Sequence, residues 1–167
     1  NGCKGLGEVT ANISITDKRV VNLFRQCGEA GLPVTFHIGT QKGGCYGLID
    51  KINLPGLEEL LQKCPHTVFL GHSQAFWAEI SGDLTEEERS GYPEGPVTKG
   101  GRLQELLNRY DNLFCDLSAH SGFNALSRDR EYAGEFLETY RDKLLFGSDY
   151  LREGCDPPLI QYLHKIN

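Results

Sequence analysis

Short runs of apolar residues recur along the chain, and each is followed by a side chain that can bind a metal ion or move a proton. The runs precede His37, His72, Asp116 and Asp149, and the last of them reads Leu-Leu-Phe-Gly-Ser before its aspartate. Unbroken apolar runs of roughly four to eight residues are typical of strands that are buried on both faces of a parallel sheet. The pattern therefore predicts strands whose final residues leave the core and reach a polar site.

Five strands are expected from this pattern. The first, Lys4–Val9, is a glycine-rich stretch with Glu8 near its end. The other four are expected at Val34–His37, Thr67–His72, Leu113–Leu117 and Lys143–Phe146.

Stretches with helical spacing separate the strands. Val20, Phe24 and Cys27 recur at this spacing after Thr16 or Asp17, either of which can cap a helix. Pro55 suits the first position of a second helix, because its missing N–H would have no partner there. Further helices are expected at Arg102–Tyr110, at Arg130–Tyr140 and after Pro157-Pro158, and loops at 38–54, 73–101 and 118–129.

The spacing of the strands predicts an α/β fold. Their functional ends are separated by 29, 35, 44 and 33 residues, by subtraction between Glu8, His37, His72, Asp116 and Asp149. A βαβ unit with a right-handed crossover needs about 30 residues or more. A (β/α)₈ barrel and a doubly wound sheet both fit, but acidic and imidazole groups at so many strand ends favour a barrel. Because a barrel takes about 250 residues, the 167 residues predict a single domain, 1–167, forming a partial barrel without its first strands.

Composition narrows the choice of partners. The net charge of −6 argues against binding to nucleic acid or to an anionic membrane. No apolar stretch reaches the roughly 20 residues that span a bilayer, and the first residues of the sequence do not show the pattern of a signal peptide. The six cysteines have irregular spacing, and Cys27, Cys64 and Cys115 fit apolar patterns, which favours reduced thiols and a cytoplasmic location.

The chain lacks methionine and starts with Asn1, so we expect it to be part of a longer protein.

The strand ends supply the donor types of a metal site. Neutral imidazole and carboxylate suit zinc and manganese, so His37, His72 and Asp149 are predicted ligands, with Glu8 as a further one. A metal in such a site lowers the pKa of water to about 7, and Asp149 and His72 are the expected catalytic residues. One histidine at a strand end is more often a structural hydrogen-bonding group, but two with an aspartate at matched positions favour a site. Asp116 is expected to be a structural or supporting group.

Three other residues are predicted to contact a small-molecule substrate. Trp77 and His120 lie in the segments that follow the third and fourth strands, and Tyr46 lies in the long loop after the second. Loops of this length in a compact domain are often functional.

A second motif supports a different chemistry. Gly71-His72-Ser73-Gln74-Ala75 differs in one residue from Gly-x-Ser-x-Gly, the nucleophile elbow of serine esterases with an α/β-hydrolase fold. Asp116 or Asp149 and then His164 would complete the order Ser, Asp, His. This alternative leaves His37 without a role. A third reading is a non-catalytic half-barrel that acts only as an assembly subunit.

The ordered set GLPVTFHIG, FLGHSQAFW, NLFCDLSAHSG and LLFGSD resembles the amidohydrolase-2 family of metal-dependent hydrolases and decarboxylases. The resemblance runs from Gly5 to about Leu151. It implies a distorted barrel of which this chain supplies strands four to eight. It also implies that His37 binds metal, that His72 lies beside the metal, and that Asp149 binds metal and handles the proton.

One departure from the family's pattern leads to a prediction about partners. Members of the family normally carry a His-x-His pair on the first strand, and this chain has no such pair. A half-barrel exposes two sheet edges and an apolar interior face, which favours association. We therefore expect either a partner segment that supplies the missing N-terminal strands or self-association.

Overall fold

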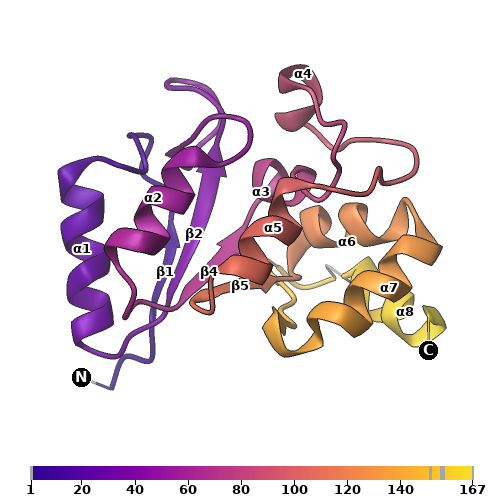
Figure 1. The fold of residues 1–167 in the computed structure, drawn as a ribbon. Helices are drawn as coiled ribbons and strands as arrows, with labels where there is room; N and C mark the ends of the chain where they lie inside the picture. The colour runs from indigo at the N-terminus through magenta and orange to yellow at the C-terminus, as the bar shows by residue number, and fades with distance from the viewer. Residues whose placement is uncertain (1, 151, 155–156, 167) are drawn as a thin grey trace.

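A parallel sheet forms the centre of the molecule (Figure 1). The structure is a computed structural model and describes residues 2–150, 152–154 and 157–166. The strands lie in the order β1-β2-β4-β5-β6, which is also their order along the chain, and β3 pairs with β2. Their bounds are β1 Leu6–Val9, β2 Val34–Gly39, β3 Leu48–Ile49, β4 Phe69–His72, β5 Leu113–Asp116 and β6 Leu144–Leu145.

This strand order distinguishes the two predicted folds. A doubly wound sheet reverses its strand order at a switch point, whereas neighbouring barrel strands follow one another along the chain. The described strands show no reversal, and the sheet does not close, since β1 and β6 lie at its two ends. The prediction of an α/β fold with the arrangement of a partial barrel is confirmed.

Helices connect the strands, and α1, α2 and α5 lie together on one face of the sheet (Figure 1). The side chain of Asp17 caps α1 by accepting a hydrogen bond from the Arg19 backbone, and Pro55 is the first residue of α2, as predicted. The helices are α1 Lys18–Glu29, α2 Pro55–Lys63, α3 Gln74–Ala78, α4 Glu86–Arg89, α5 Arg102–Arg109, α6 Ala119–Ser127, α7 Arg130–Tyr140, a 3₁₀ turn Arg141–Lys143 and α8 Pro158–Ile166.

The core lies between the sheet and these helices. The ring of Phe69 meets those of Phe24 and Phe36 edge-on, at centroid distances of 5.6 and 6.2 Å. Phe36 also meets Phe76 at 6.0 Å, and all four rings are fully buried. Edge-to-face pairs of this kind add to the free energy gained by burying the rings. The outward-facing residues of the strands are therefore held firmly against the helical layer.

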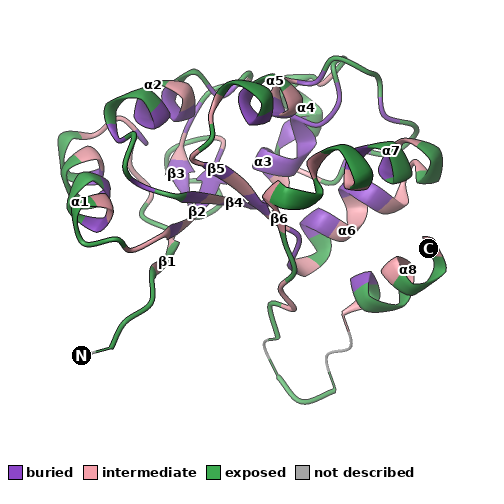
Figure 2. Cartoon of the chain, turned by 60° about the horizontal axis from the view of Figure 1, so that its bottom comes forward, coloured by how far each residue is buried: buried purple, intermediate pink, exposed green. Residues whose placement is uncertain are grey.

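The opposite face of the sheet is less covered (Figure 2). Neighbouring residues in a strand point to opposite faces, so Leu70 and Phe114 lie on the face away from Phe69, and both are only partly buried. At the β6 edge, Leu145 is 42% exposed and Phe146 is 59% exposed. In a closed barrel Leu70, Phe114 and Leu145, which pairs with Asp116, would lie in the interior.

Three predicted loops contain regular structure. Residues 118–129 form α6 over most of their length, residues 38–54 contain β3, and the 73–101 segment contains α3 and α4. The sequence of α6 has glycine, serine and asparagine, which are weak helix formers. Packing overrides this weakness, because Leu126 is fully buried and a Cβ on Gly122 would lie 2.4 Å from the Leu117 carbonyl oxygen.

The 73–101 segment is anchored to the domain instead of extending into solvent. Arg89 of α4 is fully buried and forms an ion pair with Glu79 at 2.9 Å. Its guanidinium also donates to the carbonyl of Asp50, which immediately follows β3. Removing one partner of a buried ion pair leaves the other charge unpaired in a dry environment. The ion pair thus holds Arg89 in place within the segment, and the hydrogen bond from Arg89 to Asp50 fixes the segment to the end of β3.

The described cysteines are free thiols, and Cys27, Cys64 and Cys115 are buried, as predicted. Cys155 lies outside the described residues. Within the described ranges, no helix combines the length and the apolar character needed to cross a bilayer.

A pair of glycine substitutions tests this packing. In Gly71→Ala the new Cβ would lie 2.1 Å from the ring of Phe76, so we expect unfolding to become easier by about 1–3 kcal/mol. Gly134→Ala, in α7, has no atom within 4 Å of the new Cβ and should stabilise the chain by about 0.5–1 kcal/mol through helix propensity. Urea denaturation measures both. Equal effects of the two substitutions would contradict the packing described here.

Candidate metal centre

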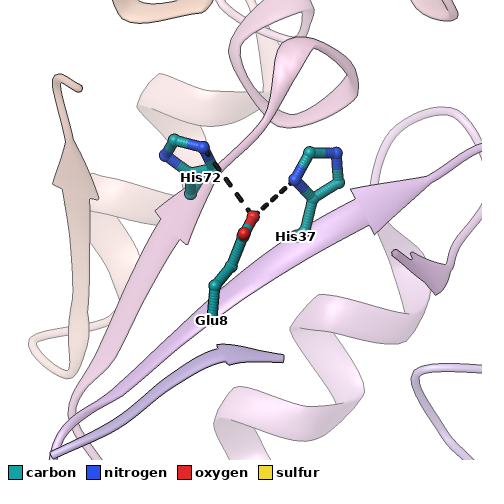
Figure 3. A group of neighbouring side chains, drawn as sticks. All are labelled: Glu8, His37 and His72. Atoms are coloured by element: carbon teal, nitrogen blue, oxygen red, sulfur yellow. Dashed lines mark hydrogen bonds and ion pairs between the residues drawn. The ribbon is translucent and has the colours of Figure 1, made fainter. Parts of the chain in front are cut away.

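Glu8, His37 and His72 converge at the ends of three neighbouring strands (Figure 3). Glu8 Oε1 lies 2.5 Å from His37 Nδ1 and 3.7 Å from His72 Nε2. One ligand atom from each residue lies within 4.8 Å of the other two. The structure thus brings together three of the four predicted metal ligands.

Strand register produces this convergence. His37 of β2 pairs directly with His72 of β4, so the two imidazoles lie at the same level of the sheet with ring centroids 5.7 Å apart. Side chains at paired positions of neighbouring strands point to the same face. Both histidines therefore point away from the helices that cover Phe36 and Phe69, and β1 brings Glu8 to them from the next strand.

The environment of His37 favours a neutral imidazole. Burial lowers the pKa of His37, although the hydrogen bond to Glu8 acts in the opposite direction. Its Nε2 atom is buried and has no hydrogen-bond partner among the described residues. Nε2 lies on the far side of the ring from Glu8, whereas Nδ1 faces the carboxylate (Figure 3). A neutral imidazole is the form that binds a cation.

His72 is oriented by a different acid. Its Nδ1 lies 3.1 Å from Asp116 Oδ2 and 3.2 Å from Ser118 Oγ. Burial lowers the pKa of His72, but the hydrogen bond and charge of Asp116, with the charges of Glu8 and Asp149, outweigh it and raise the pKa overall. A carboxylate on one ring nitrogen fixes the direction of the other nitrogen. Here it directs Nε2 toward Glu8.

Asp116 therefore has the supporting position that was expected of it. Ser118 donates its hydroxyl to Asp116 Oδ2 at 2.7 Å and its backbone N–H to Oδ1 at 3.0 Å. Burial raises the pKa of Asp116, but the hydrogen bonds from His72 and Ser118 outweigh it and lower the pKa overall. Ser118 has no predicted role, and its signal in the sequence is its position two residues after an aspartate, where short-range hydrogen bonds of this kind form.

Asp149 lies in the same cavity but outside the close group. It lines the cavity with His37 and His72, and its negative charge favours protonation of both imidazoles. Its backbone is left-handed, with φ of 49°, in the irregular segment that follows β6. The group of ligand atoms within 4.8 Å does not include Asp149. Its role as a ligand stays a prediction.

A cavity of about 390 Å³ opens above the histidines. Tyr46 and His120, both predicted to contact substrate, line it. The ring of Tyr46 lies 4.4 Å from that of His37, and His120 meets Tyr92 at 4.7 Å. The lining residues are His37, Cys45, Tyr46, His72, Gln74, Tyr92, Ala119, His120, Ser121, Ser148, Asp149, Pro157 and Pro158.

Trp77 is placed differently from the prediction. It is buried in the core and does not line the cavity. Its indole N–H donates to the Asp116 carbonyl at 3.0 Å, so it supports the strand from the helical side. Tyr92 is a lining residue that the prediction missed, since the turn-rich segment around it has no local pattern that indicates its position.

The position of Ser73 does not support a nucleophile elbow. Ser73 is 1% exposed and is not among the residues that line the cavity. Its hydroxyl oxygen accepts hydrogen bonds from the backbone N–H groups of Ile38 and Phe76, at 3.1 and 3.2 Å. Ser73 therefore acts as the N-cap of α3. The near-match to Gly-x-Ser-x-Gly has a structural explanation.

A comparison with known families gives the context of this site. A family model described as amidohydrolase matches residues 11–153. The chain belongs to the amidohydrolase family. Members of this superfamily are metal-dependent hydrolases and decarboxylases. The match includes His37, His72 and Asp149 and begins after Glu8.

Two further comparisons add nothing to this assignment. No curated protein and no solved structure gives a significant match to the chain.

The residues present at the site fit the divalent metal that is typical of this superfamily. Two imidazoles and a carboxylate are a common donor set for zinc. The position of Glu8 Oε1 between His37 Nδ1 and His72 Nε2 supports the fit independently of the family match.

The amidohydrolase chain should show the effect of Asp116 on His72 directly. By NMR titration without metal, we expect the pKa of His72 to lie above its ordinary value of 6.5, and to fall in Asp116→Asn, which loses the hydrogen bond and the charge that oppose burial most strongly. A pKa of His72 that is raised in the folded state stabilises the fold below pH 6.5, and this stabilisation is lost as the pH rises through the folded-state pKa. The part of the difference in unfolding free energy between the unchanged chain and Asp116→Asn that comes from His72 should therefore shrink above pH 6.5.

Asp111→Asn is the matched control, since Asp111 is an exposed acid just before the same strand. An unchanged His72 titration in Asp116→Asn would contradict the role given to Asp116.

Proposed function

We propose that this amidohydrolase hydrolyses a C–O or C–N bond of a small uncharged substrate with the help of one divalent cation, zinc being the first choice and manganese the second. The observation that carries the proposal is the convergence of Glu8, His37 and His72, of which the two histidines line a cavity. A cation held there would supply Lewis acidity and lower the pKa of a water molecule to about 7.

Metal binding, proton transfer and substrate contact are assigned to different side chains of this chain. Glu8 and His37 hold the cation, and His72 completes the donor set or orients the substrate from the same wall. Asp149 is the proposed proton acceptor, because its carboxylate lines the cavity without belonging to the close ligand group. Tyr46 and His120 give the substrate apolar ring faces to pack against and polar atoms for hydrogen bonds.

None of the described residues that line the cavity is lysine or arginine. The proposed cation would therefore be the main positive charge available to a substrate carboxylate, whereas a neutral ester, lactone or amide needs no such partner. Hydrolysis of a neutral substrate is the first choice, and decarboxylation of a carboxylated one is the second.

The open edges of the sheet are where the expected partner segment or second copy would pair. The β6 edge exposes Leu145 and Phe146, and Leu70 and Phe114 lie only partly covered on the inward face. We propose that further strands, from another segment or a second copy, cover this face in the active assembly. Such strands would also exclude water from the cation, which strengthens electrostatic interactions at the site.

The first test is zinc binding by isothermal titration calorimetry. His37→Ala and Glu8→Gln should each weaken zinc binding by more than about 10–100-fold, the loss typical for a residue that only supports a ligand. His66→Ala is the matched control, because His66 is exposed and lies before the start of β4, whereas His72 is the last residue of that strand. Zinc binding that is equally strong in His37→Ala and His66→Ala would contradict the proposed centre.

The second test is hydrolysis of a panel of small neutral esters, lactones and amides by the zinc-loaded chain, alone and with an added N-terminal barrel segment. Asp149→Asn should lower kcat by about 10²–10⁴-fold, as expected for loss of a general base, with zinc still bound. Asp142→Asn, in the exposed 3₁₀ turn, is the control. If the chain with the added N-terminal segment neither binds zinc nor turns over a substrate, the result would favour a non-catalytic assembly subunit instead. Release of CO₂ from carboxylated analogues would favour decarboxylation.

A further inference from the structure

The loop over His37 is held by one side chain from a distant part of the sequence. Residues 40–47, here called the Tyr46 loop, leave β2 and return to pair with it through β3, where Ile38 lies opposite Leu48. Asn12 lies in the segment between β1 and α1. Its amide Nδ2 donates to the carbonyls of Cys45 and Gly47, at 3.0 and 3.4 Å, and its Oδ1 accepts from the Gly43 N–H at 2.7 Å.

Backbone hydrogen bonds fix the segment that contains Asn12. Ile13 accepts a backbone hydrogen bond from Ile49 of β3 at 2.8 Å, and Ile15 donates to the Ile49 carbonyl at 3.0 Å. Thr10 accepts from the Gly47 N–H at 3.0 Å. Asn12 therefore joins the exposed part of the loop to a segment that is locked onto the sheet.

The loop lies directly against a proposed metal ligand. Tyr46 packs its ring 4.4 Å from the His37 ring, although the tyrosine is 55% exposed on its other side. Gly47 has φ of 124°, and a Cβ there would lie 2.9 Å from His37 Cδ2. His37 is 3% exposed, with Nε2 buried and without a partner among the described residues. The loop thus limits access to the imidazole from this side.

We propose that Asn12 is a positioning residue that holds the Tyr46 loop closed over His37. Residues 41–46 are exposed, so the apolar core does not fix this part of the loop. A segment held mainly by exposed hydrogen bonds opens locally at low free-energy cost. Asn12 acts through the loop backbone, and Tyr46 is the part of the loop that covers the imidazole.

The test uses two chemical probes and needs neither metal nor substrate, so it stands apart from the proposed hydrolysis. Trypsin cleaves after Lys42, which lies in the exposed part of the loop. Diethyl pyrocarbonate modifies accessible histidines, and peptide mass spectrometry gives the rate for His37, with exposed His66 as the internal reference. Tryptic cleavage of a folded chain follows the population of the open form.

Asn12→Ala should raise cleavage after Lys42 by about tenfold and modification of His37 by a similar factor, since three hydrogen bonds are lost. Tyr46→Ala keeps the backbone bonds to Asn12 and should raise only the modification of His37. Asn22→Ala, on an exposed position of α1, should change neither rate. Rates in Asn12→Ala equal to those in Asn22→Ala would overturn the proposal.

Asn12→Asp separates this role from a general loss of folding. Aspartate keeps an acceptor for the Gly43 N–H but loses the donors to Cys45 and Gly47. Hydrogen exchange of the Gly43 amide should therefore stay slow in Asn12→Asp and become faster in Asn12→Ala. Unchanged exchange at Gly43 in Asn12→Ala, or a global rise in exchange in both variants, would overturn the proposal.

Discussion

The parallel pairing of β2 with β4 is the constraint on which the rest of the site depends. It places His37 directly opposite His72, and the alternation of the strands then turns both imidazoles to the same face. A shift of one residue in this register would turn one histidine into the helical layer. Fully buried Phe36 and Phe69 prevent such a shift, because each would have to leave the core for the less covered face. Apolar packing on one side of the sheet therefore sets the chemistry on the other.

His37 and His72 line the same cavity but differ in electrostatic environment. Burial lowers the pKa of His37 in spite of the nearby Glu8 carboxylate. For His72 the neighbouring acids, led by Asp116, outweigh burial and raise the pKa. Groups whose pKa values are pushed in opposite directions at one site suit different tasks. A neutral His37 suits cation binding, and the acid-paired His72 suits orientation of a polar partner. The amidohydrolase family match includes both residues, and the geometry gives each a separate physical reason for its place.

The interior face links the site to the open edges of the sheet. The same alternation that directs His37 and His72 inward also directs Leu70 and Phe114 inward, where they remain partly exposed. Burying such surface is the main favourable contribution to association. Covering this face and excluding water from the histidines are therefore expected to occur together. Under the proposed association, assembly and chemistry are linked properties of this partial barrel.

The sequence by itself determined the alternating α/β pattern, the main helices, and the idea that His37 and His72 reach one site, because apolar periodicity and strand-end positions are local signals. It also suggested Glu8, whose carboxylate lies 2.5 Å from His37. Only the tertiary structure decided the rest. Trp77 entered the core, Ser73 became a helix cap, and 118–129 formed α6, since packing partners far along the chain outweighed local propensity. The Asn12 contacts to the Tyr46 loop span more than 30 residues, and no local pattern encodes a hydrogen bond between segments that only the fold brings together.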